Sequence, residues 1–238
     1  MPRATSTFPT LRTTALLLVH PGALDRAIHD GARVRYFKPI SLFLLINVLF
    51  VMLSPINDFY VSLYEQLNFQ PYSSWTRPWV EQLAVSKGLS LDEFATLYNQ
   101  LVHVLARSLI IAQVPFFALA AALLMRKPGY YAADHLTFAL NAHSWLMVLI
   151  VVAQIPSWLI GLGIAAIGVS LDADLLYLLS LPVGFFVYTW MAGRRLYQLS
   201  HLSMAWKTPL FLLALFASHM GFRFCQLIIT ALLVGTDL

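Results

Sequence analysis

Two pairs of basic side chains stand four residues apart inside apolar stretches, and they are the residues best placed to do chemistry. His103 and Arg107 lie near one end of a run from about 101 to 125, and His219 and Arg223 lie within a run from about 209 to 234. Residues at positions i and i+4 share one helix face. An arginine in lipid must turn inward and find a partner. Such a face predicts a site for an anionic group.

A third apolar run carries one more polar candidate, His143, on the same helical stripe as Gln154. Three interpretations of these histidines and arginines stay open. The first is interhelical hydrogen bonding that only fixes packing, which is worth about 0.6 kcal/mol per contact. The second is an anion or headgroup site. The third is a histidine that handles protons. The ligand-binding candidates are therefore His103, Arg107, His143, His219 and Arg223.

Enzyme templates are absent from the sequence. There is no Gly-x-Ser-x-Gly, no phosphate-binding glycine-rich loop and no His-Glu-x-x-His. We expect the acidic residues to lie in loops, which argues against a carboxylate proton relay. The single cysteine, Cys225, excludes an internal disulfide and a cysteine-rich zinc site. We therefore predict no catalytic residue, no metal and no cofactor.

The composition identifies the surroundings of these residues. Of 238 residues, 59% are hydrophobic and 11% are charged, whereas soluble domains have about 45–50% and about 25%. This excludes an ordinary soluble enzyme and a disordered chain. The net charge of +4 is too scattered for a nucleic-acid site. The predicted partner is the lipid bilayer.

Five apolar runs approach the length of about 20 residues that a membrane-spanning helix needs. They are continuous rather than alternating, which favours helices over barrel strands. We predict an all-α, polytopic membrane bundle of about five transmembrane helices with an N-terminal amphipathic helix pair. The expected spans are 37–56, 101–125, 136–160, 175–192 and 209–234, with Pro115, Pro156 and Pro182 kinking three of them.

The basic residues predict the orientation. Eleven of the fifteen Lys and Arg residues precede span one, lie at its start (Lys38) or lie in the connectors at 126–135 and 193–208, with Lys207 in the second connector. Only Arg77 and Lys87 fall on the opposite side. Because cytoplasmic loops carry the excess of Lys and Arg, we expect the N-terminus inside and the C-terminus outside.

Two segments outside the spans complete the domain prediction, with a membrane domain over 37–238. Residues 1–36 contain two helical patterns separated by Pro21-Gly22, and we expect a retained cytoplasmic juxtamembrane segment. It is either a topogenic anchor or a headgroup or partner site. Residues 57–100 form an outer aromatic segment, either an interfacial belt or a ligand surface. Ser90 and Glu93 predict a capping box, and a helix from there could run unbroken to Met125.

The order of several short motifs resembles a known family. They are Pro21-Gly22; Gly31, Arg33, Arg35, Tyr36, Lys38 and Pro39 before the first span; Pro115; Tyr130-Tyr131, Asp134 and His135; His143; Tyr188; and Arg194, Arg195 and Tyr197. Over roughly residues 16–235 the chain resembles the bacterial membrane family called domain of unknown function 3667. The resemblance implies a bacterial inner-membrane protein and supplies no activity or residue roles. Members often begin with a zinc ribbon of paired Cys-x-x-Cys motifs. This sequence has none, so it lacks the ribbon or starts downstream of it, and no metal role transfers.

Three functions remain open. The first is binding or transport of an anionic solute or lipid headgroup through Arg107 and Arg223. The second is a membrane-anchored interaction, regulatory or assembly protein. The third is an enzyme directed at a lipid phosphate, with His219 or His143 as acid or base. The sequence leaves the ligand and the oligomeric state open.

Overall fold

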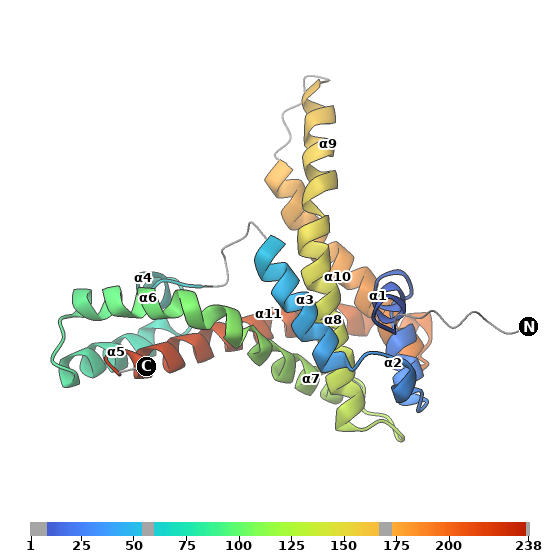
Figure 1. Cartoon of the computed structure of the whole chain (residues 1–238), viewed down its shortest axis with the longest axis horizontal. Helices are drawn as coiled ribbons and strands as arrows, with labels where there is room; N and C mark the ends of the chain where they lie inside the picture. The colour runs from blue at the N-terminus through green and yellow to red at the C-terminus, as the bar shows by residue number, and fades with distance from the viewer. Residues whose placement is uncertain (1–8, 54–59, 167–172, 237–238) are drawn as a thin grey trace, which may run out of the picture. The chain divides into compact units, whose positions relative to one another are not determined.

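The computed structural model describes residues 9–53, 60–166 and 173–236, and in that part every regular element is a helix. The chain divides into two compact units (Figure 1). The first comprises Met1–Ser54 and Phe117–Leu215, and the second comprises Pro55–Phe116 and Phe216–Leu238. The all-helical architecture that the apolar runs predict is confirmed.

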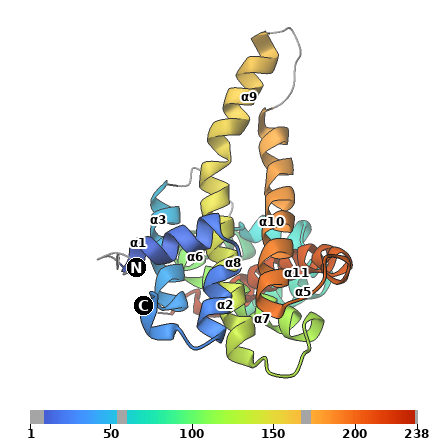
Figure 2. The ribbon, with the colours of Figure 1, turned by 90° about the vertical axis from the view of Figure 1, so that its right-hand side faces the viewer.

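The first unit is built around two long helices that run side by side, one formed by α8 and α9 and the other by α10 (Figure 2). Helix α3 packs along α8, and α2 contacts both α8 and α10. Phe117, Phe138, Phe185 and Phe211 meet in the interior and are fully buried. The elements of the first unit are α1 (Pro9–Val19), α2 (Ala23–His29), η1 (Arg33–Arg35), α3 (Pro39–Leu53), most of α7 (Gln113–Leu124), α8 (Ala132–Val152), α9 (Gln154–Ala166), α10 (Ala173–Tyr197) and the first half of α11 (His201–Leu233).

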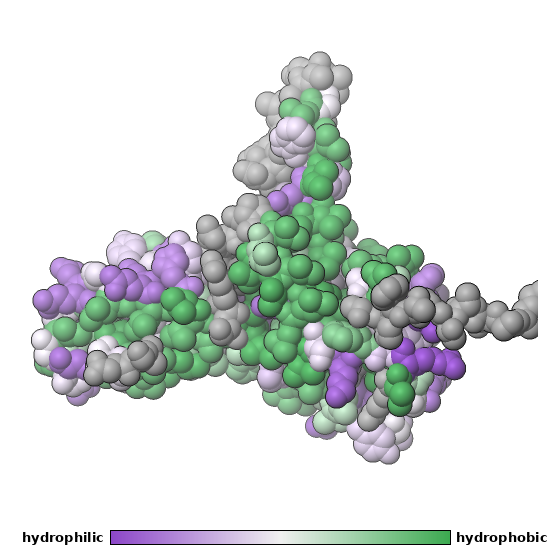
Figure 3. Space-filling view, viewed as in Figure 1, coloured by the Kyte–Doolittle hydropathy of each residue, from purple (hydrophilic) through white to green (hydrophobic). Residues whose placement is uncertain are grey.

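The second unit packs three helices, α4 (Leu63–Asn68), α5 (Ser73–Ser86) and α6 (Leu91–Leu109), with the C-terminal part of α11. Buried Phe94, Tyr98 and Val102 recur every four residues along α6 and join the core that includes Leu227 and Ala231 of α11. The opposite face of α6 is hydrophilic (Figure 3). This is the pattern of an amphipathic helix with one face in a core.

Among the described residues, three helices are long and apolar enough to cross a membrane: Ala132–Gly163, Leu175–Tyr197 and His201–Leu233, with 32, 23 and 33 residues. A fourth span exists if the bent pair Leu91–Ala106 and Ile110–Leu124 crosses as one. Helix α3 is apolar but has 15 residues, and residues 54–56 of the predicted first span lie outside the described part. The exposed faces of α3 and α8 form an apolar surface (Figure 3). The five predicted spans therefore become three or four, plus one short apolar helix.

The prolines explain where the long runs break. Pro115 and Pro156 are each the third residue of a helix, α7 and α9, which follows a break. A proline has no N–H to donate, and only the first turn of a helix tolerates this without loss. The chain therefore forms a short 3₁₀ turn, η2 (Ile110–Ala112), before α7. The unbroken helix considered from Ser90 to Met125 is accordingly divided, whereas α10 continues through Pro182.

Two expectations about charged residues are wrong. Lys207 lies inside α11 rather than in a connector, because α11 begins at His201. Acidic residues also lie in helices rather than in loops. Asp25 is in the first turn of α2, Glu65 in that of α4 and Asp134 in that of α8. Carboxylates are stabilised at these positions by the free N–H groups and the positive end of the helix dipole.

Candidate functional site

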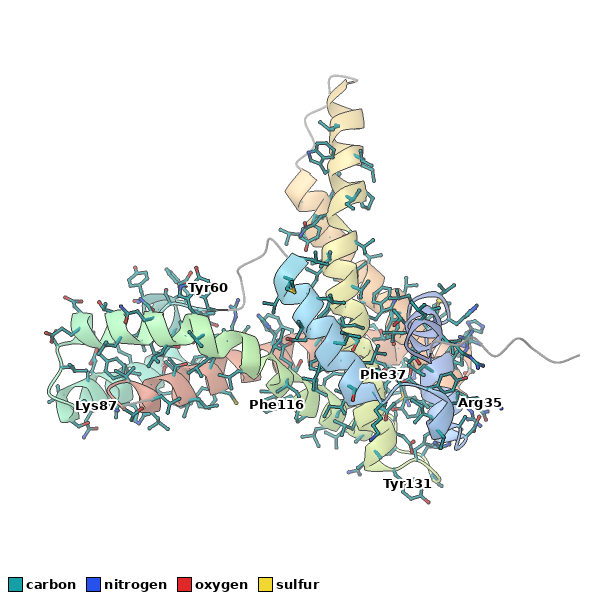
Figure 4. The ribbon with its side chains drawn as sticks, in the orientation of Figure 1. Arg35, Phe37, Tyr60, Lys87, Phe116 and Tyr131 are labelled. Atoms are coloured by element: carbon teal, nitrogen blue, oxygen red, sulfur yellow. The ribbon has the colours of Figure 1, made fainter. Side chains whose placement is uncertain are left out.

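Arg223 lines a pocket of about 410 Å³ within the second unit. Helix α11 contributes Phe216, Met220 and Arg223, which are spaced to share one helix face. The remaining lining comes from α4 and the residues on either side of it, including Tyr60 (Figure 4). The full lining consists of Tyr60, Val61, Glu65, Phe69, Gln70, Pro71, Phe216, Met220 and Arg223. We call this space the Arg223 pocket.

A buried amide network holds the two walls of the Arg223 pocket together. The Nε2 of Gln66 donates to the backbone oxygen of Arg223 at 3.3 Å and to Oε1 of Gln226 at 3.4 Å. The backbone N–H of Val61 also donates to Oε1 of Gln226, and the Tyr72 hydroxyl donates to Oε1 of Gln66 at 2.6 Å. Networks of satisfied buried polar groups make a structure rigid. The backbone at Val61 and Arg223 is thereby fixed.

The guanidinium of Arg223 has an unsatisfied donor. Its Nε is buried, and no hydrogen-bond acceptor reaches it in the described part of the chain. A buried donor without an acceptor costs about 1–3 kcal/mol, and more when the group is charged. Where Arg223 lines the pocket, an anion would form charge-assisted hydrogen bonds with the exposed part of the guanidinium.

Glu65 brings a negative charge to the same pocket. It caps α4 together with Ser62, whose backbone N–H and hydroxyl donate to its Oε2 at 2.9 and 2.7 Å. These hydrogen bonds, and to a smaller extent the charge of Arg223, lower the pKa of Glu65. The carboxylate is therefore ionised at neutral pH. Among the described residues no ion pair joins it to Arg223.

The other predicted basic residues of the second unit differ in whether they contact the residues that line the pocket. The His103 ring packs against the ring of Tyr60, with centroids 3.7 Å apart, and so supports the pocket wall. The His219 ring lies 5.9 Å from that of Phe222, and His219 is not among the pocket-lining residues. Arg107 belongs to α6, but its side chain is outside the described part.

His143 belongs to the first unit, where it is 3% exposed. Its Nδ1 lies 2.8 Å from the backbone oxygen of Ala139, one turn earlier in α8, and its ring meets Phe117 edge to face. These contacts are those of a core histidine. Its Nε2 is buried without a hydrogen-bond partner among the described residues.

Several motif residues meet at the end of α10 and hold it to α2 and α8. The guanidinium of Arg195 donates to the backbone oxygen of Pro21 at 2.9 Å. The Tyr130 hydroxyl donates to the backbone oxygen of Leu196 at 2.8 Å, and Lys127 donates to that of Tyr197 at 3.0 Å. The last carbonyls of a helix have no partner within the helix. Tyr130 and Lys127 therefore satisfy two carbonyls at the C-terminus of α10.

Histidines join the same contact region. The Tyr197 hydroxyl and Nδ1 of His135 are hydrogen-bonded at 2.8 Å. His29 of α2 stacks on Tyr130 with centroids 4.4 Å apart and lies 3.2 Å from the carboxylate of Asp134. In the described part of the chain no three His, Cys, Asp or Glu side chains are grouped to hold a metal ion.

Asp25 is the residue in this region that the sequence did not indicate. It is 2% exposed, and its Oδ1 accepts a hydrogen bond from Nδ2 of Asn141 at 2.9 Å. Its Oδ2 is buried and meets no donor from the described residues. Burial raises the pKa of Asp25 to about 7.

The motif before the first predicted span borders a separate groove of about 580 Å³ in the first unit. Tyr36, Lys38 and Pro39 form one side, and Ala133 and Thr137 of α8 form part of the other. Phe37 also lines it, with exposed Arg35 close in sequence (Figure 4). The other motif residues are dispersed: Gly31 is an exposed turn residue with φ of 92°, the side chain of Arg33 is outside the described part, Pro115 is exposed, and Arg194 is half-buried.

Comparison with known families supports the resemblance at the N-terminal end. The family described as Protein of unknown function (DUF3667) matches residues 10–51. That segment covers most of α1, all of α2 and η1, and most of α3. The chain matches no curated protein and no solved structure. The match confirms a likeness to this family over the segment and assigns no activity.

Proposed function

We propose that this protein is a multi-pass membrane protein whose second unit binds the anionic group of a small solute or lipid headgroup at Arg223. The observation that carries the proposal is the buried, unpartnered Nε of an arginine that lines a pocket. Arg194 also has a buried Nε without a described partner but is not among the residues that line the Arg223 pocket, whereas two other arginines differ from both. Arg77 and Arg195 each donate to a backbone oxygen at about 3 Å.

The surroundings of Arg223 suit an amphiphilic ligand. A guanidinium binds phosphate and carboxylate through paired N–H donors. Phe69, Phe216 and Met220 supply apolar wall for the carbon part of the same molecule. Ligand sites are commonly apolar with a few well-placed polar groups. The pocket combines both.

We further propose a bacterial inner-membrane location with the N-terminus in the cytoplasm and the C-terminus outside, following the basic residues, an arrangement in which the short apolar helix α3 also crosses the membrane. In this orientation α11 leaves the cytoplasmic surface near Lys207. The sixteen residues from there to Arg223 span about 24 Å at 1.5 Å each. A hydrocarbon core is about 30 Å thick. Arg223 would then lie just below the outer headgroups, which its long side chain can reach.

The test is calorimetric titration of the purified full chain with inorganic phosphate. Arg223→Gln should weaken binding at least about tenfold, equivalent to about 1.4 kcal/mol. The control is Arg126→Gln, because Arg126 is an exposed arginine in the first unit. Since the Arg223 Nε makes no hydrogen bond, Arg223→Gln should not lower the melting temperature of the ligand-free protein. A variant that binds phosphate like the parent would refute the proposal.

A further inference from the structure

We infer that the Arg223 pocket takes a zwitterion, with its phosphate or carboxylate at Arg223 and its ammonium group at Glu65. This inference rests on the proposed function of Arg223 and names the class of ligand. It begins from the presence of one positive and one negative side chain on the lining of a single pocket. The two charges do not neutralise each other, since no ion pair joins Glu65 to Arg223 among the described residues.

Glu65 is held in place with one oxygen still available. Both hydrogen bonds from Ser62 go to Oε2. No described donor reaches Oε1, and the Glu65 side chain is exposed at the pocket. The carboxylate is therefore fixed by the start of α4 and can accept an ammonium donor without rearrangement. Preorganised acceptors of this kind lose little entropy on binding.

Aromatic rings complete a surrounding that suits an ammonium group. Tyr60 and Phe69 line the pocket together with Glu65. The ring of Tyr60 is packed on His103 and therefore cannot turn freely. Cations are attracted to the faces of such rings, more strongly where water is excluded.

The two fixed charges also determine which ligands the pocket binds less tightly. A simple anion at Arg223 would lie near the Glu65 carboxylate and be repelled by it. A simple cation at Glu65 would be repelled by Arg223. A molecule that carries both charges a few atoms apart satisfies both side chains at once. Specificity commonly depends on such repulsion of the wrong ligand.

The source of the zwitterion is either a lipid headgroup, such as phosphatidylethanolamine, or a soluble molecule with the same chemistry. Phosphoethanolamine represents the shared chemistry, because it has one ammonium and one phosphate. Inorganic phosphate and ethanolamine represent the separate charges. These three probes test the inference on the full chain in detergent.

We expect the parent protein to bind phosphoethanolamine at least tenfold more tightly than either inorganic phosphate or ethanolamine. Glu65→Gln should remove this preference, weakening phosphoethanolamine about tenfold while leaving phosphate binding unchanged or tighter. Gln is also a capping-box residue at this position, so α4 keeps its N-terminal cap. The matched control is Glu93→Gln, which alters the equivalent capping box of α6 away from the pocket lining.

The outcomes separate this inference from the proposed function. If Glu65→Gln tightens phosphate and phosphoethanolamine by the same factor, Glu65 is only a counter-charge, and the zwitterion inference fails while anion binding stands. If the parent binds phosphate and phosphoethanolamine equally, the inference fails in the same way. If Arg223→Gln leaves both affinities unchanged, both fail.

Lipid nanodiscs distinguish the source once the preference is established. Parent protein should retain phosphatidylethanolamine over phosphatidylglycerol in native mass spectra, and Glu65→Gln should lose this preference. Retention of neither lipid, with phosphoethanolamine still bound, assigns the site to a soluble zwitterion. Preferential retention of phosphatidylglycerol by the parent would overturn the inference.

Discussion

At the scale of single residues, the most unusual titratable group of the first unit is the buried carboxyl of Asp25. Its carboxyl is buried between α2 and α8, with one oxygen bonded to Asn141. Tyr188 and Tyr197 of α10 lie close enough to feel its charge. Burial raises the pKa of Asp25 to about 7, against about 3.9 for an exposed aspartate. Ionising it in the folded protein therefore costs free energy.

The sign of this effect gives a pH prediction. Between about pH 4 and pH 7 the folded state holds a proton on Asp25 that the unfolded state has released, so stability falls as the pH rises through this window. Asp25→Asn keeps an acceptor for Asn141 and cannot ionise. The variant should melt several degrees above the parent at pH 8, and this difference should shrink towards pH 4.5. Circular dichroism in detergent measures both curves.

Asp30→Asn is the control for this experiment. Asp30 is half-exposed and forms a surface ion pair with Arg26, so its removal should shift both ends of the pH curve alike and by about 1 kcal/mol or less. Parallel pH curves for the parent and Asp25→Asn would contradict the proposed burial of the Asp25 charge.

The sequence predicts charged site residues by their type and apolar context, but not their partners. Arg223 stands out because a guanidinium in an apolar run must be accommodated somehow, and it does line a pocket. Glu65 precedes it by more than 150 residues and is marked only by its capping box with Ser62. No sequence pattern marks Asp25 as a site residue, because the short helix that contains it has the pattern of a surface segment. Such pairings depend on tertiary contacts that no local pattern encodes.

At the scale of elements, the contact between α2 and α10 depends on the turn at Gly22. Its φ is 76°, in the left-handed region that glycine adopts most readily. A Cβ added there would lie 2.5 Å from the backbone oxygen of Ala192 and 2.6 Å from its Cα. These are backbone atoms of a buried helix, which cannot move aside as a side chain can.

Gly22→Ala should therefore destabilise the protein by well over the roughly 1–2 kcal/mol that a left-handed alanine costs by itself, and the melting temperature should fall accordingly. Gly129→Ala supplies the comparison. Gly129 has φ of 87° and nothing within 4 Å of an added Cβ, so its substitution shows the backbone cost alone. Equal losses in the two variants would mean that α2 does not approach α10 as described.

Element boundaries follow the sequence where a local cause exists. The capping box predicted at Ser90 and Glu93 begins α6 and is confirmed. The division before α7 follows from Pro115, which the sequence predicts as a kink. The start of α11 at His201 is less predictable, because Pro209 suggests a start eight residues later, yet α11 continues through it. Tertiary packing of buried Met204 and Thr208 outweighs the local preference there.

At the scale of the whole molecule, the composition indicates a membrane protein, whereas the number of membrane crossings depends on one bent pair of helices. In the described part of the chain, three helices qualify as spans by themselves, and Leu91–Ala106 and Ile110–Leu124 qualify only as a pair. A bent pair either crosses the bilayer as a broken helix or returns to the side from which it entered. The basic residues on its two sides, Lys87 before it and Arg126 and Lys127 after it, favour a crossing from outside to inside.

This crossing can be measured with a thiol reagent that does not pass through membranes. The single cysteine, Cys225, is first replaced by serine, and Ser86→Cys or Pro128→Cys is then introduced, since both positions are exposed on either side of the bent pair. In intact cells stripped of their outer membrane, position 86 should be labelled, and position 128 should be labelled only after the inner membrane is opened. Labelling of both from outside would make the pair re-entrant and leave three spans from this region onwards. The reverse pattern would invert the proposed topology and place the Arg223 pocket at the cytoplasmic headgroups, because Arg223 lies in the half of α11 farther from Lys207.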